Sequence, residues 1–201
     1  DSDINTLMSV YSQMGGLYKR VAEFENERIA DSNAERLAWQ IGDTISALRL
    51  MWLQACCLFD SRNQSEAIMI LDSIAQFTEK NGIQEDPDLI YPIKTDYYLE
   101  RKDIKCAEIL LREYEYKTGI LTESLDTLNY DMAHFYLKGK YYNIAQKPDS
   151  AIQMFNKLLH LLGQRPLYTS QRHGLKEVSY QELTQAYSLK HQPDSVIKYA
   201  N

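Results

Sequence analysis

A short phrase of this sequence occurs twice at a fixed separation. Tyr142 is followed six residues later by Pro148, which begins Pro-Asp-Ser, and Tyr187 is followed in the same way by Pro193, 45 residues further on. Self-similarity at such a spacing is typical of repeat proteins, in which each unit is one supersecondary element that buries its apolar face against its neighbours. The phrase therefore predicts a repeat architecture.

Each copy of the phrase predicts two helices joined by a turn. On the N-terminal side, apolar or small residues recur at steps of three and four, as expected for one face of a helix: Leu125, Leu128, Met132, Phe135, Gly139 and Tyr142. The C-terminal side repeats this pattern with Ala151, Ile152, Phe155, Leu158, Leu159 and Leu162. Pro148 suits a first helical turn, where its missing N–H has no partner to lose. We expect Gly139 and Ala151 to be small because two antiparallel helices approach closely there.

The five positions Phe135, Gly139, Tyr142, Ala151 and Phe155 resemble the tetratricopeptide repeat (TPR), which alternates aromatic and small residues at these spacings. Looser copies follow the same template, and they are Met51/Ala55/Leu58/Ala67/Leu71, Tyr91/Thr95/Tyr98/Ala107/Leu111 and Tyr180/Thr184/Tyr187/Val196. Their second-helix small positions lie 40 to 45 residues apart, whereas a TPR unit has ~34 residues. The resemblance implies TPR-like hairpins with lengthened helices.

We therefore expect an all-α fold, a right-handed superhelix of about five antiparallel helix pairs. The chain of 201 residues is the size of one domain. It divides into an atypical capping hairpin over residues 1–42 and repeats over 43–82, 87–119, 123–163 and 167–201. Since the chain stops partway through a helix whose apolar stripe has no cap, we expect the native protein to continue.

Glycine and proline predict where helices end. We expect the first helix over 1–14, ended by Gly15-Gly16, and then one long helix from 17 to about 40, with a break near 31–33 because Asp, Ser and Asn favour caps. Further helices are expected over 44–60, 65–80, 103–118, 123–146, 148–162, 168–190 and 193–201. Between them, Pro92 predicts a short helix after Asp86-Pro87-Asp88.

Composition argues against several functional classes. The net charge is −6 and no long Lys/Arg run exists, so a nucleic-acid footprint is not expected. No apolar run approaches the ~20 residues that span a bilayer. The sequence opens with Asp-Ser-Asp rather than Met, so we expect that something has been removed. The chain has three cysteines, Cys56, Cys57 and Cys106. Because their number is odd and two of them are adjacent, we expect buried thiols rather than a disulfide framework.

No motif for catalysis, a cofactor or a metal is present. The four histidines, His134, His160, His173 and His191, are scattered without a zinc-binding spacing. Gly-rich phosphate loops and Gly-x-Ser-x-Gly elbows are also missing. We therefore expect a protein that is not an enzyme and that uses its surface.

Stacked helical hairpins enclose a concave face, lined mainly by the first helix of each pair, that binds extended peptides or partner helices. Residues on those first helices beside the packing stripe are the candidates for contact with a protein or peptide, and they are Arg49, Trp52, Asp96, Tyr136, Lys140, Asn143, Gln181 and Gln185. The alternative for each is an ordinary solvent-facing role, and for Trp52 a core role.

The phrases KPDSAIQMFNKLL and QPDSVIKYAN are similar to repeats of bacterial TPR sensor regions that precede a membrane segment and an output module. This resemblance implies a periplasmic or other extracytoplasmic ligand-sensing domain. A cytoplasmic regulator resembling the peptide-sensing phosphatases, which dephosphorylate or block a response regulator, is the alternative. A plain scaffold without a switch is a third possibility.

Overall fold

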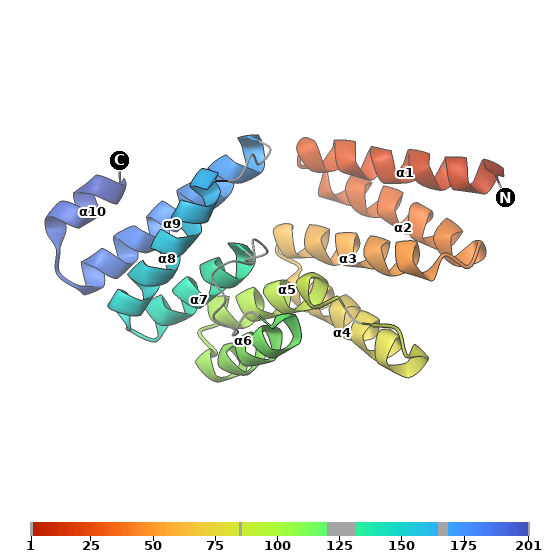
Figure 1. Cartoon of the computed structure of the whole chain (residues 1–201). Coiled ribbons are helices and arrows are strands. Elements are labelled where there is room, and N and C mark those ends of the chain that lie inside the picture. Colours follow the sequence, from red (N-terminus) through yellow and green to blue (C-terminus); the bar gives the residue numbers. More distant parts are fainter. Residues whose placement is uncertain (1, 85, 120–131, 165–168, 201) are drawn as a thin grey trace. The chain divides into compact units, whose positions relative to one another are not determined.

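The computed structural model describes residues 2–84, 86–119, 132–164 and 169–200, and within these ranges every regular element is an α-helix. Figure 1 shows the helices in chain order. Their bounds are α1 Ser2–Arg20, α2 Phe24–Gln40, α3 Thr44–Asp60, α4 Gln64–Asn81, α5 Pro87–Glu100, α6 Ile104–Thr118, α7 Met132–Ile144, α8 Pro148–Gln164, α9 Thr169–Leu189 and α10 Pro193–Ala200. The all-α prediction is confirmed.

The chain forms two compact units, residues 1–93 and 94–201. In the first, α1 packs on α2, α2 on α3, and α3 on α4. In the second, α7 packs on α6, α8 and α9, while α9 also packs on α8 and α10. Sequential neighbours therefore cover one another's apolar stripes, as expected for stacked hairpins. The single solenoid over 1–201 and its repeat limits stay a prediction.

The same backbone turn ends helix after helix. In each copy an N–H bonds back to the carbonyl five residues earlier, as in a Schellman motif. The pairs are Glu23 to Tyr18, Asp43 to Ala38, Asn63 to Leu58, Ile83 to Thr78, Asp103 to Tyr98, Lys147 to Tyr142, and Gln192 to Tyr187, with N···O distances of 2.8 to 3.1 Å. The repeated Tyr-to-Pro phrase thus encodes this turn, because Tyr142 and Tyr187 supply the accepting carbonyls.

The residue before each donor adopts a left-handed backbone conformation. Gly42 and Gly82 take it without steric cost, with φ of 74° and 63°. Non-glycine residues take it elsewhere, and these are Ala22, Arg62, Lys102, Gln146 and His191. Residue type alone therefore does not reveal most of these turns.

The N-terminal hairpin differs from the prediction. Helix α1 continues through Gly15-Gly16 to Arg20, and the turn falls at residues 21–23. A Cβ at Gly15 would overlap the Asp31 carboxylate of α2, so this glycine allows close helix approach. The expected long helix from 17 to 40 is therefore wrong. Its possible break near 31–33 is also wrong, since these residues lie inside α2.

The ends of several other helices were predicted more accurately. The helices expected over 44–60, 65–80 and 103–118 match α3, α4 and α6 to within a residue at each end. Pro92 lies inside the 14-residue α5 rather than at its start, so this helix is longer than expected. Residues 120–131 and 165–168 lie outside the described residues, and with them Leu125, Leu128 and the turn expected before Pro166.

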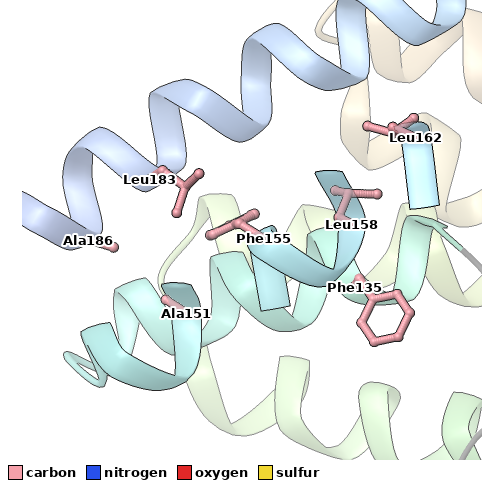
Figure 2. Close-up of a cluster of buried hydrophobic side chains, with 7 residues drawn as sticks. All are labelled: Phe135, Ala151, Phe155, Leu158, Leu162, Leu183 and Ala186. Carbon is pink, nitrogen blue, oxygen red and sulfur yellow. The ribbon is translucent and has the colours of Figure 1, made fainter. Parts of the chain in front are cut away.

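The predicted contact of small and aromatic residues between the helices of a pair is confirmed. Ala151 and Phe155 are completely buried, and Phe135, Leu158, Leu162, Leu183 and Ala186 complete the cluster (Figure 2). At Gly139, an added Cβ would lie 2.5 Å from Phe155 Cζ, closer than side-chain atoms can approach. Any larger residue at position 139 would therefore displace the Phe155 ring.

Two acidic side chains of α2 are buried one turn apart. Glu27 and Asp31 are each 2 % exposed, and Lys19 Nζ lies 3.8 Å from Glu27 Oε1. Burial, helped by the charge of Glu27, raises the pKa of Asp31 to about 6. Burial also raises the pKa of Glu27, although the Lys19 charge opposes this shift. The fold therefore disfavours the charged form of both groups.

Gly139→Leu is expected to destabilise the second unit by roughly 1–3 kcal/mol or more, because it overpacks the contact with Phe155. The measurement is the melting temperature by circular dichroism. Gly174→Leu is the matched control, since Gly174 is an exposed helical glycine of the same unit with no atom near its Cβ position. Equal melting temperatures for the two variants would contradict a tight contact at Gly139.

Stability is expected to fall as the pH rises from about 4 to about 6. In this window folded Asp31 holds a proton that the unfolded chain has released, so folding takes up a proton and higher pH opposes it. Asp31→Asn should flatten this dependence and raise the free energy of unfolding at neutral pH, by on the order of 1–3 kcal/mol. Urea unfolding at a series of pH values measures both. Parallel curves for the variant and the wild type would disprove the assignment.

Candidate functional site

The eight predicted contact residues all lie on odd-numbered helices. Arg49 and Trp52 belong to α3 in the first unit. The other six belong to the second unit, with Asp96 on α5, Tyr136, Lys140 and Asn143 on α7, and Gln181 and Gln185 on α9.

In the first unit, Arg49 and Trp52 line a pocket of about 440 Å³ between α3, α4 and the start of α5. Its remaining lining residues are Ile45, Leu48, Ile74, Thr78, Ile83, Gln84, Asp86, Leu89 and Ile90. Ligand pockets usually enclose ≈300–1,000 Å³ and combine apolar walls with a few polar groups. The pocket has the size and composition of a small binding site.

The walls of this pocket are apolar and its polar groups differ in availability. Asp86 Oδ1 already accepts a hydrogen bond from the backbone N–H of Asp88, at 3.1 Å, where α5 begins. Arg49 is exposed, and no described residue forms an ion pair with it. The half-buried Trp52 has an indole Nε1–H without a hydrogen-bond acceptor among the described residues. The pocket therefore offers an apolar cavity beside one free cation.

In the second unit, Lys140 joins α7 to α5. Its Nζ lies 2.5 Å from Asp96 Oδ1, and both side chains are mostly buried. Burial raises the pKa of Asp96, and the neighbouring Lys140 opposes that shift. Lys140 Nζ also lies 5.9 Å from the Tyr136 ring centroid, a cation–π distance. Burial raises the pKa of Tyr136, whose ring packs edge-on against Phe155.

Asn143 joins α7 to α9 in the same unit. Its Nδ2 donates to the backbone oxygen of Glu182 at 2.9 Å and to Glu182 Oε2 at 2.8 Å, and the side chain is buried. Gln181 and Gln185 are exposed one turn apart on α9. The structure thus brings Asp96, Tyr136 and Lys140 together, and engages Asn143 with a neighbouring helix. A role for these six residues in contacting a partner stays a prediction.

Sequence reasoning missed a buried polar cluster between α6 and α7. His134 Nε2 lies 2.8 Å from Glu115 Oε1, and Lys138 also bonds to that carboxylate. Burial acts to raise the pKa of Glu115, but hydrogen bonds and charges from His134 and Lys138 lower it overall. The only sequence signal was the four-residue spacing of His134 and Lys138, since Glu115 comes from another helix. The cluster links the two helices.

The cysteines differ in their surroundings. Cys57 is buried, and its Sγ donates to the Phe24 carbonyl at 3.2 Å. Burial raises the pKa of this thiol to about 12, which makes it a poor nucleophile. Cys56 and Cys106 are half-buried, so the expected burial is confirmed only for Cys57. Within the described ranges, no cluster of three His, Cys, Asp or Glu residues could hold a metal ion.

None of the described helices is both long enough and apolar enough to cross a membrane. No protein-family model and no curated protein matches this sequence. Solved structures do match it across nearly the whole chain. The protein MamA is 14 % identical with a TM-score of 0.54, and the alignment covers 97 % of this chain and 88 % of that one.

Two further structures match at least as well. A Podospora anserina protein assigned as a kinesin light chain, with nearly identical TPR-like repeats, is 12 % identical over 96 % of this chain and 91 % of its own, with a TM-score of 0.59. BtubC (BKLC) from P. vanneervenii is 14 % identical over 99 % and 89 %, with a TM-score of 0.58. The chain has the fold of the TPR-like repeat proteins. At these identities the likeness shows the fold, which is that of a helical-repeat protein.

Proposed function

We propose that this TPR-like chain is a non-catalytic scaffold that binds a protein or peptide, as the ligand-sensing or partner-binding region of a bacterial signalling or regulatory protein. The pocket beside Arg49 is the observation that carries the proposal. It lies on α3, the first helix of its pair, where TPR-like scaffolds present their binding surfaces. The likeness of the C-terminal phrases to bacterial sensor repeats supports the signalling role.

The chemistry of the pocket suggests which peptide it takes. Leu48, Ile74 and Ile90 form nearly fully buried walls that suit an aliphatic or aromatic side chain. Arg49 suits a carboxylate, because guanidinium groups bind carboxylates through charge-assisted hydrogen bonds. A peptide that places an apolar side chain next to an Asp, a Glu or a free C-terminus satisfies both.

A peptide array can test this function. Its peptides would carry an apolar residue beside Asp, and matched peptides would carry the same residue beside Asn. The wild-type chain should retain the Asp series preferentially. Arg49→Glu should weaken that binding about tenfold to hundredfold, since a hydrogen bond to a charged group contributes about 1.5–3 kcal/mol. Arg36→Glu, at an exposed arginine on α2, is the matched control and should bind as the wild type does.

Titration of the best peptides by calorimetry gives the affinities. Circular dichroism of each variant checks that its helices are intact. If the array retains no peptide, or if Arg36→Glu loses as much affinity as Arg49→Glu, the pocket is not the binding site.

A further inference from the structure

Helix α1 carries two apolar stripes, and α2 covers only one of them. Met8 and Tyr11 pack toward the small residues Ala34 and Ala38 of α2, and Gly15 abuts Asp31. The second stripe faces solvent. It consists of five apolar residues that are each between 36 % and 64 % exposed, and they are Leu7, Val10, Met14, Leu17 and Val21.

The spacing of the exposed stripe is that of a coiled-coil seam. Its members follow one another at steps of three, four, three and four, so the pattern repeats every seven residues. The first four lie on one side of α1, and Val21 directly follows the end of this helix. Single exposed apolar side chains are common on protein surfaces, but a continuous row of five indicates a contact surface. In Figure 1, α1 runs beside α2 at the edge of its unit.

We propose that this stripe, Leu7 to Leu17 of α1 together with Val21 of the turn that follows, pairs with the same stripe of a second copy of the chain in an antiparallel arrangement. Antiparallel pairing of identical helices gives a closed two-fold interface, in which each copy uses the same surface. Leu7 of one copy then packs against Leu17 of the other, and Val10 packs against Met14. The two-fold axis passes between Val10 and Met14, so each of these two contacts occurs twice in the dimer.

The charges at the ends of α1 select the antiparallel direction. Asp3 lies in the first turn, in line with the stripe, and Arg20 lies in the last turn. When Leu7 faces Leu17, Asp3 of one copy lies beside Val21 and Arg20 of the other, so opposite charges meet at both ends. A parallel pair would instead place Asp3 beside Asp3. Opposite helix dipoles also favour the antiparallel pair.

Sedimentation equilibrium of the whole chain tests the dimer. The wild type should sediment as a dimer that dissociates on dilution. Val10→Glu with Leu17→Glu should lower the molar mass about twofold, because a closed pair becomes two monomers. Both side chains are exposed, so the helical circular dichroism should not change. Ile109→Glu with Tyr116→Glu removes two exposed apolar residues from α6, and this control should stay dimeric.

A charge exchange tests the direction. Asp3→Arg should weaken the dimer, and adding Arg20→Asp should restore it, since each end then again joins opposite charges. If the double exchange fails to restore the dimer, the antiparallel assignment is wrong. A wild type that stays monomeric at every concentration, or a dimer that survives Val10→Glu with Leu17→Glu, overturns the proposal. The occupant of the stripe would then be a different polypeptide segment.

Discussion

One backbone hydrogen bond, repeated at the ends of successive helices, determines where each helix of this protein ends. In each turn an N–H returns to the carbonyl five residues earlier, after one residue in the left-handed conformation. From α1 to α5 the accepting carbonyls belong to Tyr18, Ala38, Leu58, Thr78 and Tyr98, which follow one another at intervals of 20 residues. Each helix and its turn therefore occupy the same length, and a pair occupies about 40 residues.

Uniform turns matter because they let the apolar stripes of neighbouring helices meet in register. In the second unit the small residues Gly139 and Ala151 allow α7 and α8 to approach, and Phe155 fills the space between them. In the first unit Gly15 serves the same purpose for α1 and α2. The turns thus set the lengths of the helices, and the small residues set the distance between neighbouring helices.

The sequence was sufficient to predict hairpins where residue type and geometry agree. Tyr142, Pro148, Ala151 and Phe155 mark both the turn and the packing, and this pair was predicted correctly except for the residues that the structure leaves undescribed. The N-terminal pair was predicted wrongly for a physical reason. Gly15-Gly16 has the composition of a turn but serves close packing, while the real turn uses Ala22, whose residue type gives no sign of a left-handed backbone.

Site prediction had a similar limit. Helical spacing placed all eight candidates on the first helices, but it could not show which neighbouring helix each side chain would meet. Lys140 finds Asp96 and Asn143 finds Glu182, partners that lie 44 and 39 residues away along the chain. Likewise, the pocket beside Arg49 is completed by Ile83 from the segment after α4 and by Leu89 from the first turns of α5.

The described residues offer two surfaces to other molecules. The pocket of the first unit combines apolar walls with Arg49, whereas the outer stripe of α1 is apolar along its whole length. The first suits a side chain with a neighbouring negative charge, and the second suits another helix. None of the residues that line the pocket belongs to α1.

If one turn recurs at the helix ends, including that of the N-terminal hairpin, the amides that close it should exchange slowly with solvent. Amide hydrogen exchange measured by NMR can show this. We expect slow exchange for the amides of Glu23, Asp43, Asn63, Asp103, Lys147 and Gln192, because each donates the hydrogen bond that closes its turn. We also expect protection of Gly16 and Leu17 inside α1. Exchange of Glu23, Gly16 and Leu17 at the rate of an unfolded chain would contradict a recurring turn.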